Sequence, residues 1–140
     1  MSMSPEQFAA HYALDIDLID SDHWKLISAM NVINEAIKSN NTVAVKEGSA
    51  ILLKELRIHC AREEAYMIKI NYPFFKYHRD CHAALIRTMT HLVESIPITL
   101  YAQPTTTDTL YSVFVTHIDT IDLQIRDYVV KNNLQTETHI

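Results

Sequence analysis

Apolar residues in this chain recur at alternating steps of three and four positions, and this spacing constrains the fold more than any other feature. The first stripe consists of Ile16, Ile19, His23, Leu26, Met30, Ile33 and Ile37. Similar stripes run through residues 52–70, 75–96 and 110–128. Such steps place the residues on one face of an α-helix. Four segments of this kind predict an all-α fold, an up-down-up-down four-helix bundle.

The glycine content agrees with a helical fold. Gly48 is the only glycine among 140 residues. Glycine-rich phosphate-binding loops need two or three glycines, and the tight hairpins of antiparallel sheets rely on glycine. The sequence therefore excludes those nucleotide-binding loops and disfavours a β-sheet protein.

Polar and capping residues predict where the helices begin and end. We expect Asp20 to be the N-cap of the first long helix. Breaks between helices are predicted at Asn40-Asn41 and at Asn71-Tyr72-Pro73. The predicted organisation is an N-terminal arm over residues 1–19, a four-helix bundle over 20–132 and a C-terminal tail over 133–140.

Charge and cysteine content limit the location and the partners. Twelve basic and seventeen acidic residues are spread without a Lys/Arg block, so neither nucleic acid nor a membrane surface is an expected partner. No apolar run is long enough to span a membrane, and no signal peptide is apparent. Cys60 and Cys81 are too few for a disulfide framework, which favours a cytoplasmic protein.

Polar residues lie where the stripes require apolar ones. They are His23, His59, Glu63, His78, His82 and His117. Burying such groups without partners costs a few kcal/mol or more each. One such histidine is most often a hydrogen-bonded core residue, but six polar residues on four helices favour a shared metal site.

The spacing of these residues supports a metal site. His59 and Glu63 are four residues apart, as are His78 and His82, so each pair projects from one helix face. Asp122 follows His117 by five residues, roughly 140° around a regular helix. Asp122 can therefore join the site only if the helix widens locally or if its side chain enters from the flank.

The set of donors indicates the type of metal. Five imidazoles and two carboxylates are too many for one tetrahedral zinc ion, and calcium or magnesium would prefer oxygen ligands. Two first-row metal ions bridged by Glu63 and Asp122 fit better. With a bridging oxygen, these donors leave one coordination position open.

These motifs resemble the hemerythrin family, in particular the single-domain bacterial hemerythrins, from about Phe8 to Tyr128. Ile19-Asp20-Ser21-Asp22-His23 is similar to I-D-x-x-H. His59, Glu63, Glu64 and Met67 match H-x-x-x-E-E-x-x-M. Tyr72-Pro73 with His78 and His82 matches Y-P-x4-H-x3-H, and His117 with Asp122 matches H-x4-D.

The resemblance implies a non-haem di-iron protein, not an enzyme, in a hemerythrin-like bundle with an N-terminal arm. His78, His82 and His117 would ligate one iron ion, His23 and His59 the other, with Glu63, Asp122 and an oxo or hydroxo group as bridges. Dioxygen would bind reversibly as a hydroperoxide on the iron held by His23 and His59. The implied role is oxygen storage, delivery or scavenging.

Two positions depart from the family pattern. Cys60 stands where the family commonly has phenylalanine, and Val113 where it usually has tryptophan. Both differences remove volume near the expected dioxygen site, so we expect faster autoxidation and easier entry of small anions such as azide.

Two other functions remain open at this stage. The chain could be a dioxygen or redox sensor that acts through a partner protein, or a di-iron oxidase or peroxidase. Glu64 either hydrogen-bonds a ligand imidazole or is a solvated or ion-paired acid, and the second interpretation is favoured.

Overall fold

The computed structural model of the protein describes residues 3–99 and 105–134. In this part of the chain all regular secondary structure is helical, which confirms the all-α prediction. The helices are α1 (Pro5–Tyr12), α2 (Asp17–Lys38), α3 (Thr42–Lys69), α4 (Phe75–Thr99), α5 (Thr105–His117), the π-helical turn η1 (Ile118–Asp122) and α6 (Leu123–Lys131). Among the described residues, no helix is both long and apolar enough to cross a membrane.

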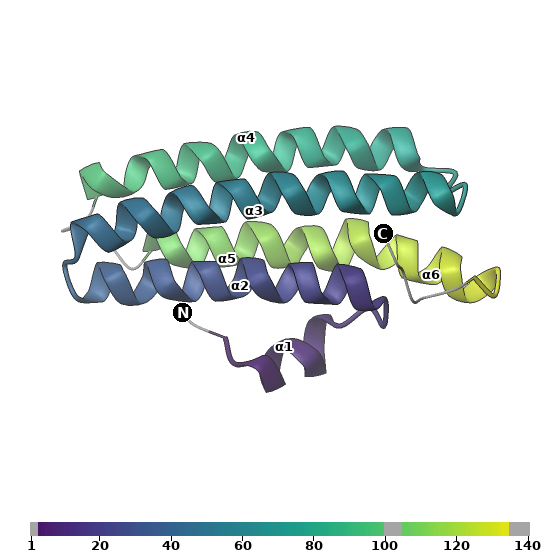
Figure 1. Ribbon diagram of the computed structural model, residues 1–140, viewed down its shortest axis with the longest axis horizontal. Helices are drawn as coiled ribbons and strands as arrows, with labels where there is room; N and C mark the ends of the chain where they lie inside the picture. The colour runs from purple at the N-terminus through teal and green to yellow at the C-terminus, as the bar shows by residue number, and fades with distance from the viewer. Residues whose placement is uncertain (1–2, 100–104, 135–140) are drawn as a thin grey trace.

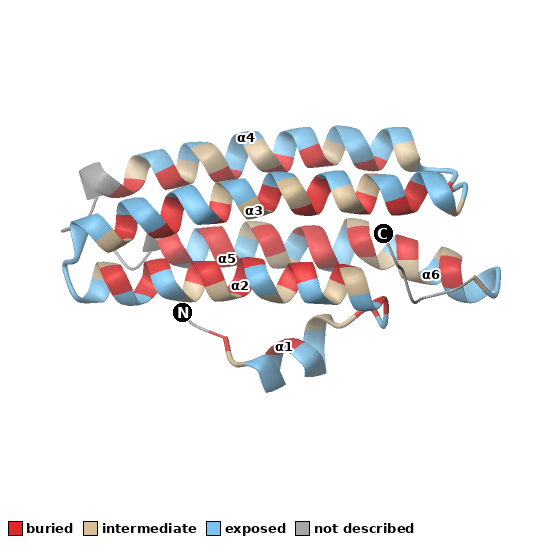
Figure 2. Ribbon diagram, in the orientation of Figure 1, coloured by how far each residue is buried: buried red, intermediate tan, exposed pale blue. Residues whose placement is uncertain are grey.

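The long helices lie side by side (Figure 1). Helix α2 packs against α3 and α5, and α4 also packs against α3 and α5. Helix α5, η1 and α6 follow one another without a break in the chain. Buried residues concentrate on the faces that the long helices turn toward one another (Figure 2), so the core runs along the length of the molecule.

Helix ends rely on asparagine instead of glycine. Asn40, Asn71 and Asn133 follow the C-terminal ends of α2, α3 and α6 and have φ angles of 53°, 54° and 51°. This left-handed conformation is the usual place for glycine, and asparagine is the residue that tolerates it next best. The predicted breaks near Asn40 and Asn71 are therefore confirmed, with a physical cause.

The predicted start of the first long helix was wrong. Helix α2 begins at Asp17, and the N-cap is Ile16, which makes no side-chain capping bond. Asp20 lies inside the first turn, where its carboxylate accepts hydrogen bonds from the N–H groups of Leu14 (2.8 Å) and Asp15 (3.0 Å). Asp20 thus stabilises the loop before the helix. Aspartate side chains commonly bond nearby backbone N–H groups, both in turns and at helix N-caps.

Part of the predicted arm is itself a helix. Ser4 and Gln7 form a capping box at the start of α1, and Phe8 packs against Trp24 of α2 with 5.9 Å between ring centroids. Helix α1 therefore lies along the outer side of α2 (Figure 1). Most of the predicted tail, residues 135–140, lies outside the described residues.

Candidate metal centre

The seven predicted ligands converge in the interior of the molecule, and each is at most 7% exposed. They come from α2 (His23), α3 (His59, Glu63), α4 (His78, His82), α5 (His117) and η1 (Asp122). Their donor atoms form two groups, and within each group the atoms lie within 4.8 Å of one another. Glu63 and Asp122 belong to both groups.

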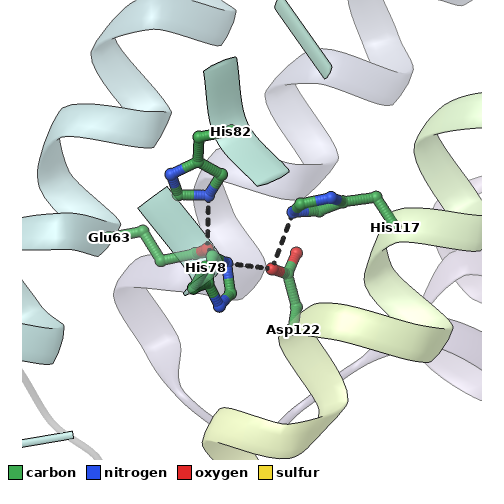
Figure 3. Close-up of side chains that lie close together, drawn as sticks. All are labelled: Glu63, His78, His82, His117 and Asp122. Carbon is green, nitrogen blue, oxygen red and sulfur yellow. Dashed lines mark hydrogen bonds and ion pairs between the residues drawn. The ribbon is translucent and has the colours of Figure 1, made fainter. Parts of the chain in front are cut away.

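The first group contains three histidines (Figure 3). His78 Nε2 lies 2.7 Å from Glu63 Oε1 and 2.9 Å from Asp122 Oδ1. His82 Nε2 lies 2.9 Å from the same Glu63 oxygen, and His117 Nε2 lies 3.0 Å from the same Asp122 oxygen. Each of these two carboxylate oxygens thus contacts two imidazole nitrogens, and His78 contacts both oxygens.

The second group contains two histidines. His23 Nε2 lies 3.0 Å from Asp122 Oδ2 and 3.6 Å from Glu63 Oε2. His59 Nε2 lies 3.1 Å from the same Glu63 oxygen. The two imidazole rings meet edge to face, with centroids 4.7 Å apart.

Each carboxylate therefore divides its two oxygens between the groups. Oε1 of Glu63 and Oδ1 of Asp122 face three histidines, while Oε2 and Oδ2 face the other two. Donor atoms about 3 Å apart are what two ligands at right angles to one ion, each roughly 2.1 Å from it, would show. The cluster could hold a metal ion, and its geometry suits carboxylates shared between two positions.

The π-helical turn explains how Asp122 reaches the cluster. The N–H of Leu123 bonds the carbonyl of Ile118, five residues earlier. In such a turn the residue five positions after His117, rather than four, lies one turn further along the same face. Of the two solutions considered from the sequence, local widening of the helix is the one observed.

Several polar atoms of the cluster have no hydrogen-bond partner among the described residues. They are Nε2 of His23, His59, His78 and His117, Nδ1 of His23 and His78, Oε2 of Glu63, and both oxygens of Asp122. Such orphaned buried atoms cost of the order of 1–3 kcal/mol each, and more when they are charged. Because imidazole nitrogens and carboxylate oxygens are metal ligands, bound cations would satisfy the Nε2 atoms and the carboxylate oxygens among them.

The electrostatics show what the cluster does without a cation. Burial alone would lower the pKa of His59, but the charge of Glu63 and the hydrogen bond to Asp22 raise it to about 10. Burial would also lower the pKa of His78, but Asp122 and Glu63 raise this pKa to about 9. Protons on the imidazoles therefore balance the buried carboxylates when no metal ion does, and metal binding would displace them.

Two further carboxylates lie behind the imidazoles. The Nδ1–H of His82 donates to Glu64 Oε2 at 2.8 Å, so the less favoured interpretation of Glu64 is the observed one. The Nδ1 atom of His59 lies 3.4 Å from Asp22 Oδ2, and Arg62 donates to Asp22 Oδ1 at 2.8 Å. The sequence did not indicate Asp22, because its partners His59 and Arg62 come from another helix and share no spacing with it.

Apolar side chains enclose parts of the cluster. The ring of Phe114, fully buried, meets His23 edge to face with centroids 5.4 Å apart. Cys60 is 1% exposed, and burial together with the charges of Glu63 and Asp122 raises the pKa of its thiol. Cys60 is therefore a neutral core side chain beside His59, which agrees with its interpretation as a small buried thiol.

No protein-family model, curated protein or solved structure matches the chain. The resemblance to hemerythrins therefore rests on the sequence motifs alone.

Proposed function

We propose that the protein is a non-haem di-iron protein of hemerythrin type that binds dioxygen reversibly, for storage, delivery or scavenging, and is not an enzyme. We also propose that its long helices form the up-down-up-down bundle of that family, in the cytoplasm. One observation carries the proposal: one oxygen of Glu63 and one of Asp122 together contact His78, His82 and His117, while the other oxygen of each carboxylate faces His23 and His59. This is the arrangement expected of carboxylates that bridge two unequal metal positions.

The donor set supports two transition-metal ions. His78, His82 and His117 would hold one, His23 and His59 the other, and both carboxylates would bridge them. Five imidazoles with two carboxylates are typical of first-row metals, while calcium and magnesium sites consist of oxygen ligands. The position with two histidines has fewer protein donors, which leaves room for an exogenous ligand. When bound there, two iron ions supply the reversible reduction of dioxygen.

The protein side chains have three tasks in this proposal. The imidazoles of His78, His82 and His117 saturate one position, so that exchange is confined to the other. Glu63 and Asp122 balance the metal charge and fix the separation of the two positions. Phe114, fully buried and in contact with His23, excludes water there, which would protect a bound ligand from proton-assisted loss.

The histidine-rich donor set favours binding over oxidase chemistry. Ferritin-like oxidases use four carboxylates with Glu-x-x-His pairs. This cluster has two carboxylates in the bridging positions and imidazoles in the others. Neutral imidazoles stabilise highly oxidised iron less well than carboxylates do, because they bring no negative charge.

The proposal is tested by iron quantitation and optical spectra of protein produced with ample iron. We expect two iron ions per chain, and a charge-transfer band that appears when the reduced protein meets air and disappears on deoxygenation. The His23→Ala variant should lose this reversible band, whereas His91→Ala, which changes an exposed histidine outside the cluster, should keep it.

Other outcomes separate the alternatives. A protein without transition metal would overturn the proposal. Irreversible oxidation at the first exposure to air would favour a redox sensor. Sustained turnover with a reductant and peroxide would favour a peroxidase.

A further inference from the structure

The two histidine groups differ in the charge that lies behind them. One imidazole in each group has a carboxylate at its Nδ1 atom: His59 has Asp22, and His82 has Glu64. Such outer carboxylates orient a ligand imidazole and raise its basicity. The two pairs are similar in kind, so their surroundings decide whether their effects are equal.

The charge of Asp22 is countered. Arg62 Nη1 lies 2.8 Å from Asp22 Oδ1, and Lys25 Nζ lies 4.0 Å from the same oxygen. The Asp22 side chain is 5% exposed, whereas those of Arg62 and Lys25 are 41% and 53% exposed, so the direct contact with Arg62 at 2.8 Å supplies most of the compensation and the longer one with Lys25 adds little. The group formed by Asp22 and Arg62 is therefore close to neutral as seen from His59.

The charge of Glu64 is not countered in this way. Among the residues that the structure describes, no lysine or arginine forms an ion pair with Glu64, and its carboxylate contacts the imidazole of His82 instead. Its contact with the imidazole is short, 2.8 Å against 3.4 Å for Asp22 and His59. Its side chain is 25% exposed, so water screens part of its charge but does not cancel it as a cation at 2.8 Å does.

We propose that Glu64 and the Arg62–Asp22 pair are positioning residues that make the two metal positions electronically unequal. The charge of Glu64 makes the imidazole of His82 a stronger donor. This raises the affinity of the three-histidine position for cations and stabilises the more oxidised ion there. Arg62 compensates the negative charge of Asp22, so His59 gains less basicity from it, and a metal ion at the two-histidine position is easier to reduce. This inference rests on the proposed function, because it assumes that both positions hold redox-active metal ions.

Two single substitutions should shift the properties of the centre in opposite directions. In Glu64→Gln, the amide oxygen can still accept from His82 but the charge is lost, so zinc affinity should fall about 10–100-fold and the reduction potential of the iron-loaded protein should rise. In Arg62→Gln, the charge of Asp22 is no longer compensated, so zinc should bind more tightly and the reduction potential of the iron-loaded protein should fall. Zinc affinity is measured by isothermal titration of the metal-free protein, and the potential by spectroelectrochemistry.

Matched controls lie on the same helix. Glu47→Gln and Arg57→Gln remove one charge each from exposed positions of α3 and should leave both measurements unchanged. If both test variants weaken zinc binding, or leave the potential unmoved, Glu64 and Arg62 have a merely structural role and the inference is overturned. Wild-type protein that takes up no transition metal would overturn both this inference and the proposed function, while metal uptake with unshifted potentials would overturn the inference alone.

Discussion

At the scale of single residues, the buried acids decide what the interior can contain. Glu63 and Asp122 are 1% and 0% exposed, and an ionised carboxylate in such surroundings is tolerated only with cations close by. Protonated imidazoles supply this positive charge when no metal ion is bound, and a metal ion held by the same imidazoles would supply it instead. The same atoms therefore serve the folded state and the proposed function.

Cys60 and Val113 provide the first prediction. Both are smaller than the aromatic residues that the hemerythrin pattern has there, and Cys60 is fully enclosed next to His59. We expect the double variant Cys60→Phe, Val113→Trp to autoxidise several-fold more slowly than wild type, because larger apolar side chains exclude water and anions from the centre. The rate is followed from the optical spectrum in air-equilibrated buffer.

A smaller substitution separates volume from thiol chemistry. Cys60→Ser removes the thiol without adding volume and should leave the autoxidation rate close to that of wild type. An unchanged rate in the double variant, with the fold preserved, would show that these two positions do not control access to the centre.

Six of the seven candidate ligands were predictable from the sequence because their chemistry contradicts the apolar periodicity around them, whereas Asp122 lies off that periodicity and was indicated by its spacing from His117 in the H-x4-D motif. Asp22 was not predictable as a site residue, because its contact with His59 joins α2 to α3 and no spacing within one helix encodes it. Glu64 was recognised as a possible partner of an imidazole, but only the packing of α3 against α4 identifies His82 as that imidazole.

At the scale of elements, the π-helical turn sets the position of Asp122, the second carboxylate that both groups share. Ile121 stands four residues after His117 and is half-buried, while Asp122 stands five residues after it and is fully buried. Exchanging the two, as Ile121→Asp with Asp122→Ile, keeps the composition but moves the carboxylate off the face that His117 shares. We expect metal content to fall from two ions per chain to one or none, as measured by elemental analysis.

The milder Asp122→Asn variant shows what loss of charge alone does at the correct position. It should retain more metal than the exchanged variant, because an amide oxygen remains in place. Full metal content in the exchanged variant would mean that the π-helical turn does not determine the ligand position.

The N-terminal helix provides a second prediction at this scale. Asn31 of α2 joins three segments: its amide donates to the carbonyl of Met3 (2.9 Å), and its oxygen accepts from the N–H of Met3 (3.1 Å) and from the hydroxyl of Tyr111 on α5. We expect Asn31→Ala to lower the free energy of unfolding by about 1–3 kcal/mol, since it leaves part-buried donors unpaired. Limited proteolysis should then cut the segment before α2 first.

A control comes from the same helix. Glu35→Ala changes an exposed side chain one turn further along α2 and should leave the cleavage rate unchanged. Equal protection of the N-terminal segment in Asn31→Ala would show that Phe8 and its contact with Trp24 are sufficient to hold α1.

At the scale of the whole molecule, the sequence predicted the class of fold and several helix ends but not all of them. Asn40 and Asn71 stop helices because of a local backbone conformation, and local conformation is readable from residue type. The start of α2 was misplaced because Asp20 bonds the preceding loop, a contact that competes with capping and depends on how Leu14 and Asp15 turn. Helix α1 was not predicted within the N-terminal arm, because its eight residues are too few to show a clear apolar period.

The distribution of the candidate ligands over the molecule predicts that bound metal would stabilise the whole fold. Helices α2, α3, α4 and α5 and the turn η1 each contribute at least one residue to the cluster, so unfolding any of them breaks it. A metal ion at 100 times its Kd stabilises the folded state by about 2.7 kcal/mol, and each kcal/mol moves the Tm of a chain of this size by about 2–4 °C. Removing metal from loaded protein with a chelator should therefore lower the Tm by roughly 5–11 °C or more in a thermal scan followed by circular dichroism. His91→Ala should show the same drop as wild type, whereas Glu63→Ala, which removes one bridging side chain, should respond less. An identical Tm before and after complete chelation would mean that the helices pack without help from the cluster.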